Sequence, residues 1–163
     1  MRTVLGIDAG GTATRAVLCT LDGVTLGRGV AGPGNPVARG ADAASTAMAQ
    51  AVGAALRSAT RTMVTGGMVA GGMATRDMAA GDVVAGDVVA AVAGIAGRGA
   101  LDEPAVAARY AERLRAVGLR CELRTVGDAV TAYTAGSPEP SGAVLIAGTG
   151  AVAARIHAGA VVA

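Results

Sequence analysis

Apolar and polar positions at the start of the chain fall into short strand-like blocks. Residues 3–8 form an apolar run that ends in Asp8, and residues 13–20 and 24–31 resume with the same character. The dipeptide Asp22-Gly23 between the last two blocks is a strong signal for a hairpin turn. The pattern therefore predicts an antiparallel meander of three strands.

After these strand-like blocks, the apolar residues take on the spacing of helices. Two prolines within residues 32–36 predict a loop there. Over residues 40–59, apolar side chains recur every three or four positions and define one helix face, made of Met48, Val52, Leu56 and Ala59. A second helix is predicted to run from Asp102, as its N-cap, to Gly118, with a face made of Val106, Tyr110, Leu114 and Val117.

The remaining blocks complete an ordered series. Strands are predicted at residues 88–95 and 120–127, a short helix at 129–135, and a final pair of strands at 143–147 and 151–157. The predicted order is three strands followed by helix, strand, helix, strand and helix. This is the order of a ribonuclease H-like α/β lobe with a mixed five-stranded sheet. Such an order predicts a fold and does not by itself identify a function.

A five-residue repeat interrupts this series from Met63 onward, reading MVTGG, MVAGG, MATRD, MAAGD, VVAGD and VVAAV. A period of five matches neither a helix nor a strand, so it builds no continuous apolar face. Its Asp residues are too sparse for a calcium loop, and the units are shorter than the usual solenoid repeat. Residues 63–87 are therefore predicted to be a low-complexity insertion without chemistry of its own.

Composition excludes several classes of protein. The chain has 163 residues, of which 40 are Ala and 26 are Gly, and it contains no Lys, Phe or Trp. Without lysine there is no P-loop and no pyridoxal Schiff base. With two tyrosines as the sole aromatic residues, a base-stacking surface is not expected. A core with so few large side chains must pack backbone against backbone.

Charge and targeting signals point to a soluble cytoplasmic protein. The net charge is +2, and the arginines are spread along the chain, so neither a nucleic-acid partner nor a membrane is expected. The N-terminus lacks the apolar segment of a signal peptide, and no stretch suits a membrane span. Cys19 and Cys121 have no metal spacing and are predicted to be buried free thiols in a reducing compartment.

The run Asp8-Ala9-Gly10-Gly11-Thr12 is the first candidate for chemistry. Glycines let the backbone approach an anion closely, and successive N–H groups can hold phosphate oxygens. Thr12 adds a hydroxyl donor, and Asp8 at a strand end can orient a magnesium ion through its water shell. A plain glycine-rich hairpin explains the same residues equally well.

Two further sites follow the same logic. Gly148-Thr149-Gly150 is a second small-residue turn between apolar strands, and two such turns can clamp one polyphosphate. Asp128 follows a strand, where ligands of open α/β sheets bind, and its carboxylate can accept a proton from an attacking hydroxyl. Taken alone, Asp128 is better explained as a helix N-cap.

Two other features are discarded as sites. The run from Gly27 to Gly32 matches G-x-G-x-x-G, but prolines rather than a helix follow it, so the dinucleotide interpretation lacks its context. His157 is the single histidine, has no plausible nucleophile motif nearby, and is predicted to be a strand residue.

Together these motifs resemble a known superfamily, that of sugar kinases, heat-shock chaperone ATPases and actin. Residues 6–15 look like its first phosphate motif and residues 147–150 like its second. The branch that fits best is that of the N-acetylglucosamine kinases, grouped with BadF/BadG/BcrA/BcrD-type ATPases. Matches to that branch are Gly34-Asn35-Pro36, residues 93–97 and Gly127-Asp128-Ala129.

The resemblance implies ATP-dependent phosphorylation of an amino sugar, N-acetylglucosamine or glucosamine. Asp128 would be the catalytic base and contact the sugar, Asn35 would contact the sugar, and Asp8 would face Mg²⁺. The residues that would bind the ATP phosphates are Gly10, Gly11, Thr12, Thr14, Gly148, Thr149 and Gly150. Transfer would rest on positioning and electrostatic stabilisation of the phosphoryl group.

This chain also departs from the family pattern. The family often has Ser where Ala151 stands, and it has two lobes of comparable size. Residues 1–136 would be the first lobe and residues 143–163 the opening hairpin of a truncated second lobe. We expect the exposed strands near the end to favour homo-oligomers. The alternatives are a non-catalytic lobe that binds a sugar or a partner protein, and, less favoured because the cysteines do not match a cluster, an ATPase activator.

Overall fold

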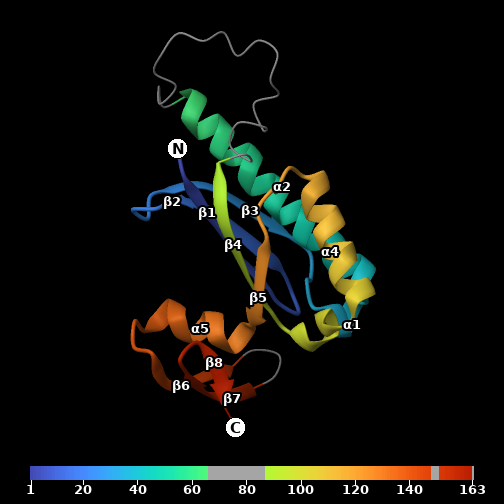
Figure 1. The fold of residues 1–163 in the computed structure, drawn as a ribbon, viewed down its shortest axis with the longest axis vertical. Coiled ribbons are helices and arrows are strands. Elements are labelled where there is room, and N and C mark those ends of the chain that lie inside the picture. Colours follow the sequence, from blue (N-terminus) through green and yellow to red (C-terminus); the bar gives the residue numbers. More distant parts are fainter. Residues whose placement is uncertain (66–86, 148–150, 163) are drawn as a thin grey trace.

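A mixed five-stranded sheet is the centre of the larger part of the molecule (Figure 1). The computed structural model describes residues 1–65, 87–147 and 151–162. The strands are β1 (Thr3–Ala9), β2 (Thr14–Thr20), β3 (Thr25–Ala31), β4 (Val88–Ile95) and β5 (Leu123–Gly127), in the order β3-β2-β1-β4-β5. The first three strands form the predicted antiparallel meander, and β4 and β5 join it in parallel. The predicted fold class is thereby confirmed.

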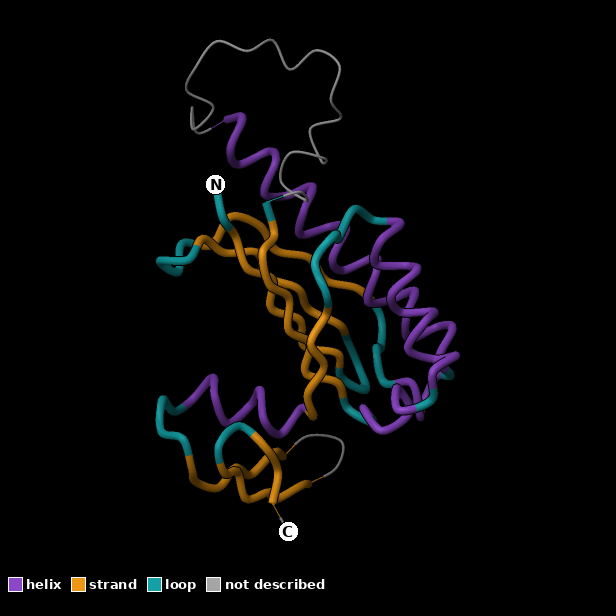
Figure 2. Tube along the Cα trace, viewed as in Figure 1, coloured by secondary structure: helices purple, strands orange, loops and turns teal. Residues whose placement is uncertain are grey.

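Helices cover the two faces of this sheet unequally. They are α1 (Pro36–Arg39), α2 (Ala41–Thr65), the 3-10 helix η1 (Arg98–Asp102), α4 (Pro104–Ala116) and α5 (Asp128–Gly136). α2 and α4 lie on one face, while α5 lies at one end of the other face (Figure 2). In β1, Leu5, Ile7 and Ala9 are buried in the main core, whereas Gly6 and Asp8 are exposed on the open face. This alternation leaves polar groups of β1 free for a ligand.

The contact between α2 and β3 is made by backbone atoms. A Cβ at Gly29 would lie 1.9 Å from the carbonyl oxygen of Ala51, and one at Gly27 would lie 2.2 Å from that of Ala55. These glycines belong to the run that resembles a dinucleotide motif. Their structural role is to let an alanine-rich helix lie directly on a strand, as the composition predicts.

A smaller unit follows β5. It consists of α5 and a three-stranded sheet of β6 (Ser141–Ala147), β7 (Ala151–His157) and β8 (Ala160–Val162). Its core contains Ala129, Val130, Tyr133 and Ile156. The predicted hairpin is thus extended by β8, which pairs with β7 over three residues.

Helix starts differ from the sequence-based expectation. Residues 32–35 form the predicted loop, and the short helix α1, which was not predicted, begins at the last residue of that segment, because Asn35 caps it and Pro36 is its first residue. Asp102 does not cap α4: it ends η1, and its carboxylate pairs with Arg98 at 3.2 Å. Glu103 occupies the cap position without a side-chain hydrogen bond.

The expectations for the repeat, the two cysteines and membrane spans can also be compared with the structure. Residues 66–86 of the predicted insertion lie outside the described residues, and β4 begins at Val88 as expected. Cys19 and Cys121 are free thiols as predicted but are half-buried, since one lies on the open sheet face and the other beside the sheet edge. Within the described ranges, no helix has the length and apolar character to cross a membrane.

Candidate active site

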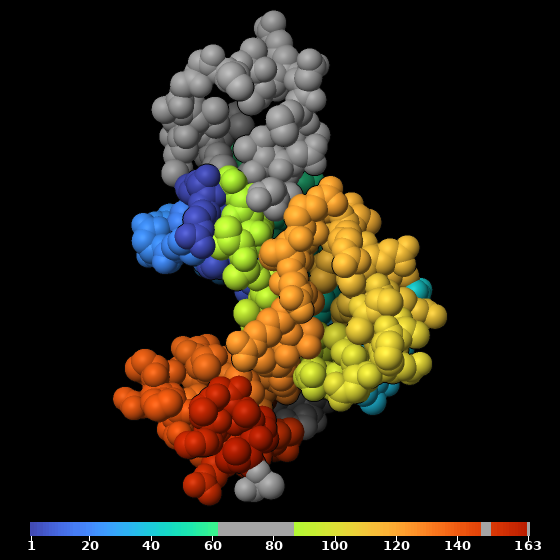
Figure 3. Space-filling view, viewed as in Figure 1, coloured from blue at the N-terminus to red at the C-terminus, as the bar shows by residue number. Residues whose placement is uncertain are grey.

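A cleft of about 1030 Å³ lies between the open face of the five-stranded sheet and the smaller unit. Figure 3 shows it as the hollow between the strands and the orange and red part of the surface. Its lining brings together polar residues and glycines that are far apart in the sequence, among them these eight: Asp8, Gly10, Gly11, Thr12, Arg15, Asn35, Asp128 and Thr131. Six of these eight are residues that the sequence singled out.

The turn between β1 and β2 presents its glycines to the cleft. The amide of Gly10 donates to the carbonyl oxygen of Ala13 at 3.0 Å, which closes the turn. Neither Gly10 nor Gly11 has a positive φ, and a Cβ at Gly11 would meet nothing within 4 Å. Packing and backbone conformation therefore do not require glycine at position 11. The open space beside it admits the close approach of a ligand.

Asp8 and Arg15 face each other beside this turn. They are paired in the register of β1 and β2, and their side chains approach to 3.6 Å. Both side chains are more than half exposed, so the ion pair adds little to stability and can be exchanged for contacts with a ligand. Among the described residues that line the cleft, Arg15 is the one cation.

Arg15 is the last residue of the predicted first phosphate motif, but the sequence analysis gave it no role of its own. It is one of 14 arginines spread along the chain, so nothing in the composition marks it. The usable signal was the hairpin itself, because a turn over residues 10–13 places position 15 opposite position 8 on the same sheet face.

Thr14 is placed differently from the other predicted phosphate residues. It is fully buried, does not line the cleft, and donates its hydroxyl to the carbonyl oxygen of Gly32 at 2.9 Å. The amide of Gly34 donates to the carbonyl oxygen of Gly10 at 2.9 Å. These two hydrogen bonds fasten the 32–34 loop to the β1–β2 turn.

Asn35 combines a structural contact with a place in the cleft. Its Oδ1 accepts hydrogen bonds from the amides of Val37 and Ala38, at 2.9 and 3.2 Å, and so caps α1. With Oδ1 engaged, the amide Nδ2 is the group of this side chain that can donate to a ligand. The cap also fixes the orientation of the side chain.

Asp128 lies at the junction of β5 and α5. It is the first residue of the helix, and Gly127 holds the cap position. Its Oδ1 accepts a hydrogen bond from the amide of Ala129 at 3.0 Å, and among the described residues its carboxylate accepts none from the amides of the two helix residues that follow. The N-cap interpretation is therefore not what the structure shows. The carboxylate is half-buried and lines the cleft.

A close contact fixes the position of α5 beneath the sheet. A Cβ at Gly94 in β4 would lie 2.2 Å from Oγ1 and 2.8 Å from Cβ of Thr131. Glycine at position 94 thus lets α5 approach β4, which brings Asp128 toward the end of β1. The sequence signalled this residue within the run 93–97, without showing its steric role.

The second predicted phosphate turn, Gly148-Thr149-Gly150, lies outside the described residues. The strands on either side of it are paired, Ala147 with Ala151. Ile146 and Val152 line the cleft.

The described residues contain no group of three or more His, Cys, Asp or Glu side chains that could hold a metal ion. Asp8 is a single exposed carboxylate beside the open turn. This donor set fits Mg²⁺, which keeps several waters and is usually held by one or two carboxylates together with substrate phosphates.

Two solved structures are similar to this chain. One is a predicted N-acetylglucosamine kinase from Porphyromonas gingivalis, with a TM-score of 0.63 and 20% sequence identity over 98% of this chain. The other is a predicted N-acetylglucosamine kinase from Chromobacterium violaceum, with a TM-score of 0.56 and 19% identity over 95% of this chain. The chain has the actin-like ATPase fold. No family model and no curated protein sequence matches it.

The actin-like fold of this chain corresponds to part of each longer protein. The chain spans about half the length of the two structures, 46% of the first and 45% of the second. The likeness at this level of identity concerns the fold, and the chemistry has to be argued from the cleft.

Proposed function

We propose that the chain is the nucleotide-binding lobe of an ATP-dependent kinase that phosphorylates an amino sugar, N-acetylglucosamine or glucosamine. The observation that carries this proposal is the shared cleft, in which the residues that resemble kinase motifs meet although they come from four separate segments. Nothing in the packing of the main core requires Asp8, Thr12 or Asp128 to lie there.

In this proposal the β1–β2 turn binds the phosphates of ATP. The amides of Gly10 and Gly11 and the hydroxyl of Thr12 would donate to phosphate oxygens, with Gly148, Thr149 and Gly150 acting from the second turn. Thr14 would hold the turn in place through Gly32. Arg15 would add a positive charge once its pairing with Asp8 is exchanged.

Asp8 would hold Mg²⁺ through its water shell. Bound in this way, the ion would neutralise charge on the phosphates during transfer. Asp128 would act on the other reactant, accepting the proton of the sugar hydroxyl that attacks the γ-phosphate. The amide of Asn35, oriented by the α1 cap, would donate to the sugar.

We also propose the two-part organisation of the chain. Residues 1–136 would be the first lobe, with residues 63–87 as an insertion, and residues 143–163 the beginning of a second lobe. The length of the two similar structures supports this division, because each is about twice as long as the part matched here.

The test separates ATP binding from transfer. Isothermal titration calorimetry with ATP, with and without Mg²⁺, is carried out on the chain, and sugar-dependent ADP release is measured on the chain and on a longer protein that contains it. Asp8→Asn is expected to weaken the Mg²⁺-dependent part of ATP binding. Asp128→Asn is expected to retain ATP binding and to lose about 10²–10⁴-fold in turnover.

Asp102→Asn is the matched control, since this carboxylate lies on η1 and does not line the cleft. It should behave like the parent protein. Unchanged turnover in Asp128→Asn would remove the proposed base. Sugar binding without any ATP binding would favour the alternative of a non-catalytic sugar-binding lobe.

A further inference from the structure

The cleft has an apolar end that the proposed phosphoryl transfer does not use. Gly6, Val17 and Val92 line it on the sheet, and Ala132 and Ala135 line it on α5. The strands β1, β4 and β5 are paired in parallel, and parallel strands are nearly always covered on both faces. Here Val92, in the middle of this part of the sheet, is 38% exposed. The open face therefore lacks a covering element among the described residues.

A single row of cross-strand neighbours crosses this face from one edge of the sheet to the other. In strand order it consists of Arg28, Val17, Gly6, Val92 and Arg124. Residues directly opposite each other on neighbouring strands share one face of a sheet. The row, called here the Arg28–Arg124 row, thus has an apolar middle and one arginine at each edge.

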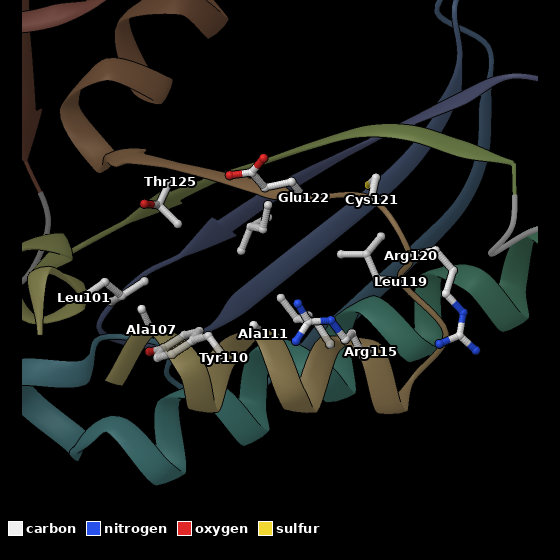
Figure 4. Close-up of a pocket in the computed structure, with 12 residues that line it drawn as sticks. Leu101, Ala107, Tyr110, Ala111, Arg115, Leu119, Arg120, Cys121, Glu122 and Thr125 are labelled. Atoms are coloured by element: carbon white, nitrogen blue, oxygen red, sulfur yellow. The ribbon is translucent and has the colours of Figure 1, made fainter. Parts of the chain in front are cut away.

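Both arginines are available to a partner. Leu123 and Thr125, the neighbours of Arg124 in β5, line a groove beside α4 on the other face of the sheet (Figure 4), which agrees with Arg124 pointing to the open face. Arg28 and Arg124 are exposed, and neither forms an ion pair within the described part of the chain. Four strand spacings separate them, about 19 Å.

The position of α5 indicates how a covering element would lie. α5 contacts β5, β4 and β1, so it crosses the strands instead of running along them (Figure 1). It meets the sheet where Thr131 packs on Gly94. Val92 precedes Gly94 by two residues, or about 6.6 Å along the strand. Since packed helices are about 8–10 Å apart, a second helix beside α5 would lie over the Arg28–Arg124 row and follow its direction.

Gly6 makes room for such a helix. A Cβ at this position would meet nothing within 4 Å, and Gly6 has no positive φ, so neither packing nor backbone conformation requires glycine here. With Val17 on one side and Val92 on the other, the missing side chain leaves a shallow depression in the middle of the row. An apolar side chain of a covering helix can enter it.

We propose that this face binds an amphipathic α-helix of a partner protein that carries a carboxylate near each end. Its apolar side lies on the depression at Gly6 and against α5, and its two carboxylates pair with Arg28 and Arg124. Carboxylates about eleven residues apart point to the same side of a helix and are about 16.5 Å apart along its axis. The long arginine side chains, which can lean inward, cover the remaining difference from about 19 Å.

A second copy of this chain does not offer such a helix. Each helix in the described part of the chain contains at most one acidic residue: α2 has Asp42, η1 has Asp102, α4 has Glu112 and α5 has Asp128. None can therefore present carboxylates to both arginines at once. The charge pattern of the row favours a different polypeptide as the occupant.

The proposal is tested with three helical peptides of about 15 residues, cross-linked on their polar face to keep them helical. All have leucine and alanine on one face and glutamine on the other. The first has two glutamates about eleven residues apart, and the others have glutamines or lysines in their place. Binding to the full chain is followed by fluorescence anisotropy at a concentration at which sedimentation velocity shows a monomer. We expect saturable binding in the order glutamate, glutamine, lysine.

Variants assign the contacts. Arg28→Gln and Arg124→Gln should each weaken the glutamate peptide by about 2- to 5-fold and leave the glutamine peptide unchanged, since an exposed ion pair contributes modestly. Gly6→Val fills the depression and should weaken all three peptides by about tenfold. Arg57→Gln is the control, because Arg57 is an exposed residue of α2 on the other face of the sheet.

Peptides with a single glutamate show the direction of the helix, because each should respond to only one of the two arginine variants. Three results would overturn the proposal: no saturable binding of the glutamate peptide, equal affinity for the glutamate and lysine peptides, or equal weakening by Arg57→Gln and the two row variants. Thermal unfolding shows whether each variant is folded. If Gly6→Val did not fold, the arginine variants would still decide the site. None of these measurements depends on kinase activity.

Discussion

Gly34 is the residue on which the geometry of the β1–β2 turn most directly depends. A Cβ at this position would lie 2.4 Å from Oγ1 of Thr14 and 2.8 Å from Cβ of Ala9. Gly34→Ala should therefore push the 32–34 loop away from the turn and reduce the free energy of unfolding by about 2–3 kcal/mol. Urea denaturation followed by far-ultraviolet circular dichroism measures this change.

Gly32→Ala is the matched control in the same loop. A Cβ there would meet nothing within 4 Å, and Gly32 has no positive φ. Its effect should stay within about 0.5 kcal/mol. Equal destabilisation by both substitutions would mean that the loop tolerates no side chain at either position. The contact with Thr14 would then not be the cause of the stability loss in Gly34→Ala.

Tyr110 gives the protein a pH dependence at the alkaline end. Burial raises the pKa of this phenol from 10.0 to about 12, so the folded state holds a proton that the unfolded state releases earlier. The unfolded chain then binds fewer protons, and the contribution of Tyr110 to stability should be constant below pH 10 and fall between pH 10 and about 12.

The expected fall is about 1–3 kcal/mol and is measured as the difference in unfolding free energy between the parent protein and Tyr110→Phe across this range. A Phe at this position removes both the ionisation and the unpartnered hydroxyl. If the two proteins lost stability in parallel above pH 10, another group would be responsible.

The pairing of α2 with β3 shows how the elements are held together. At Gly29 a Cβ would lie 1.9 Å from a carbonyl oxygen of the helix backbone, which cannot rotate away as a side chain can. Gly29→Ala should cost at least about 3 kcal/mol or prevent folding, because the whole helix must move outward.

Gly6→Ala is the comparison for a strand glycine on the open face. A Cβ at Gly6 would meet nothing within 4 Å, so its effect should be neutral or stabilising by up to about 1 kcal/mol. Thermal unfolding of the two variants gives the contrast. A stable Gly29→Ala protein would contradict the close approach of helix and strand.

The elements that the sequence predicted well are those with a long periodic pattern. β1 to β4 and the start of α2 were expected within one position, but α2 runs to Thr65, six residues beyond its predicted end and into the segment predicted as an insertion. α1, η1 and β8 are three to five residues long, and so short a segment shows no period. Their positions depend on a cap, an ion pair and a neighbouring strand, none of which a pattern of apolar residues reveals.

For the candidate site as well, local features could be predicted from the sequence, whereas features that depend on tertiary contacts could not. Asp8, Asn35 and Asp128 could be named from local motifs, because each stands near the boundary of an element, within two residues of a glycine. Their common cleft could not, since it depends on the close contact of Gly94 with α5. Arg15 required the strand register, and the buried place of Thr14 required the path of the 32–34 loop.

At the scale of the whole molecule, the outer face of the β6–β8 sheet is uncovered. Leu145 is 73% exposed, and Ala143, Ala147 and Ala153 surround it, while Ser141, Arg155 and His157 lie toward one end of the same face. An exposed apolar sheet face favours association. We expect the isolated chain to self-associate with rising concentration in sedimentation velocity experiments, and Leu145→Lys to shift it toward the monomer.

Leu21→Lys is the control for added charge alone. Leu21 is 58% exposed in the turn after β2, away from the β6–β8 sheet. It should leave the association unchanged. A parent chain that stays monomeric at all concentrations, or an equal response to both substitutions, would show that this face is not the site of association.

The direct contact between α2 and β3 also has a calorimetric consequence. Eight of the twenty buried residues of the main core are alanines, and the chain has no Phe or Trp, so this core buries less apolar surface per residue than one rich in large aromatic side chains. The heat capacity change of unfolding should then lie below the usual value of about 12–15 cal/mol/K per residue. With a smaller heat capacity change, the curve of stability against temperature is flatter, so a modest maximum stability is retained over a wide range of temperature.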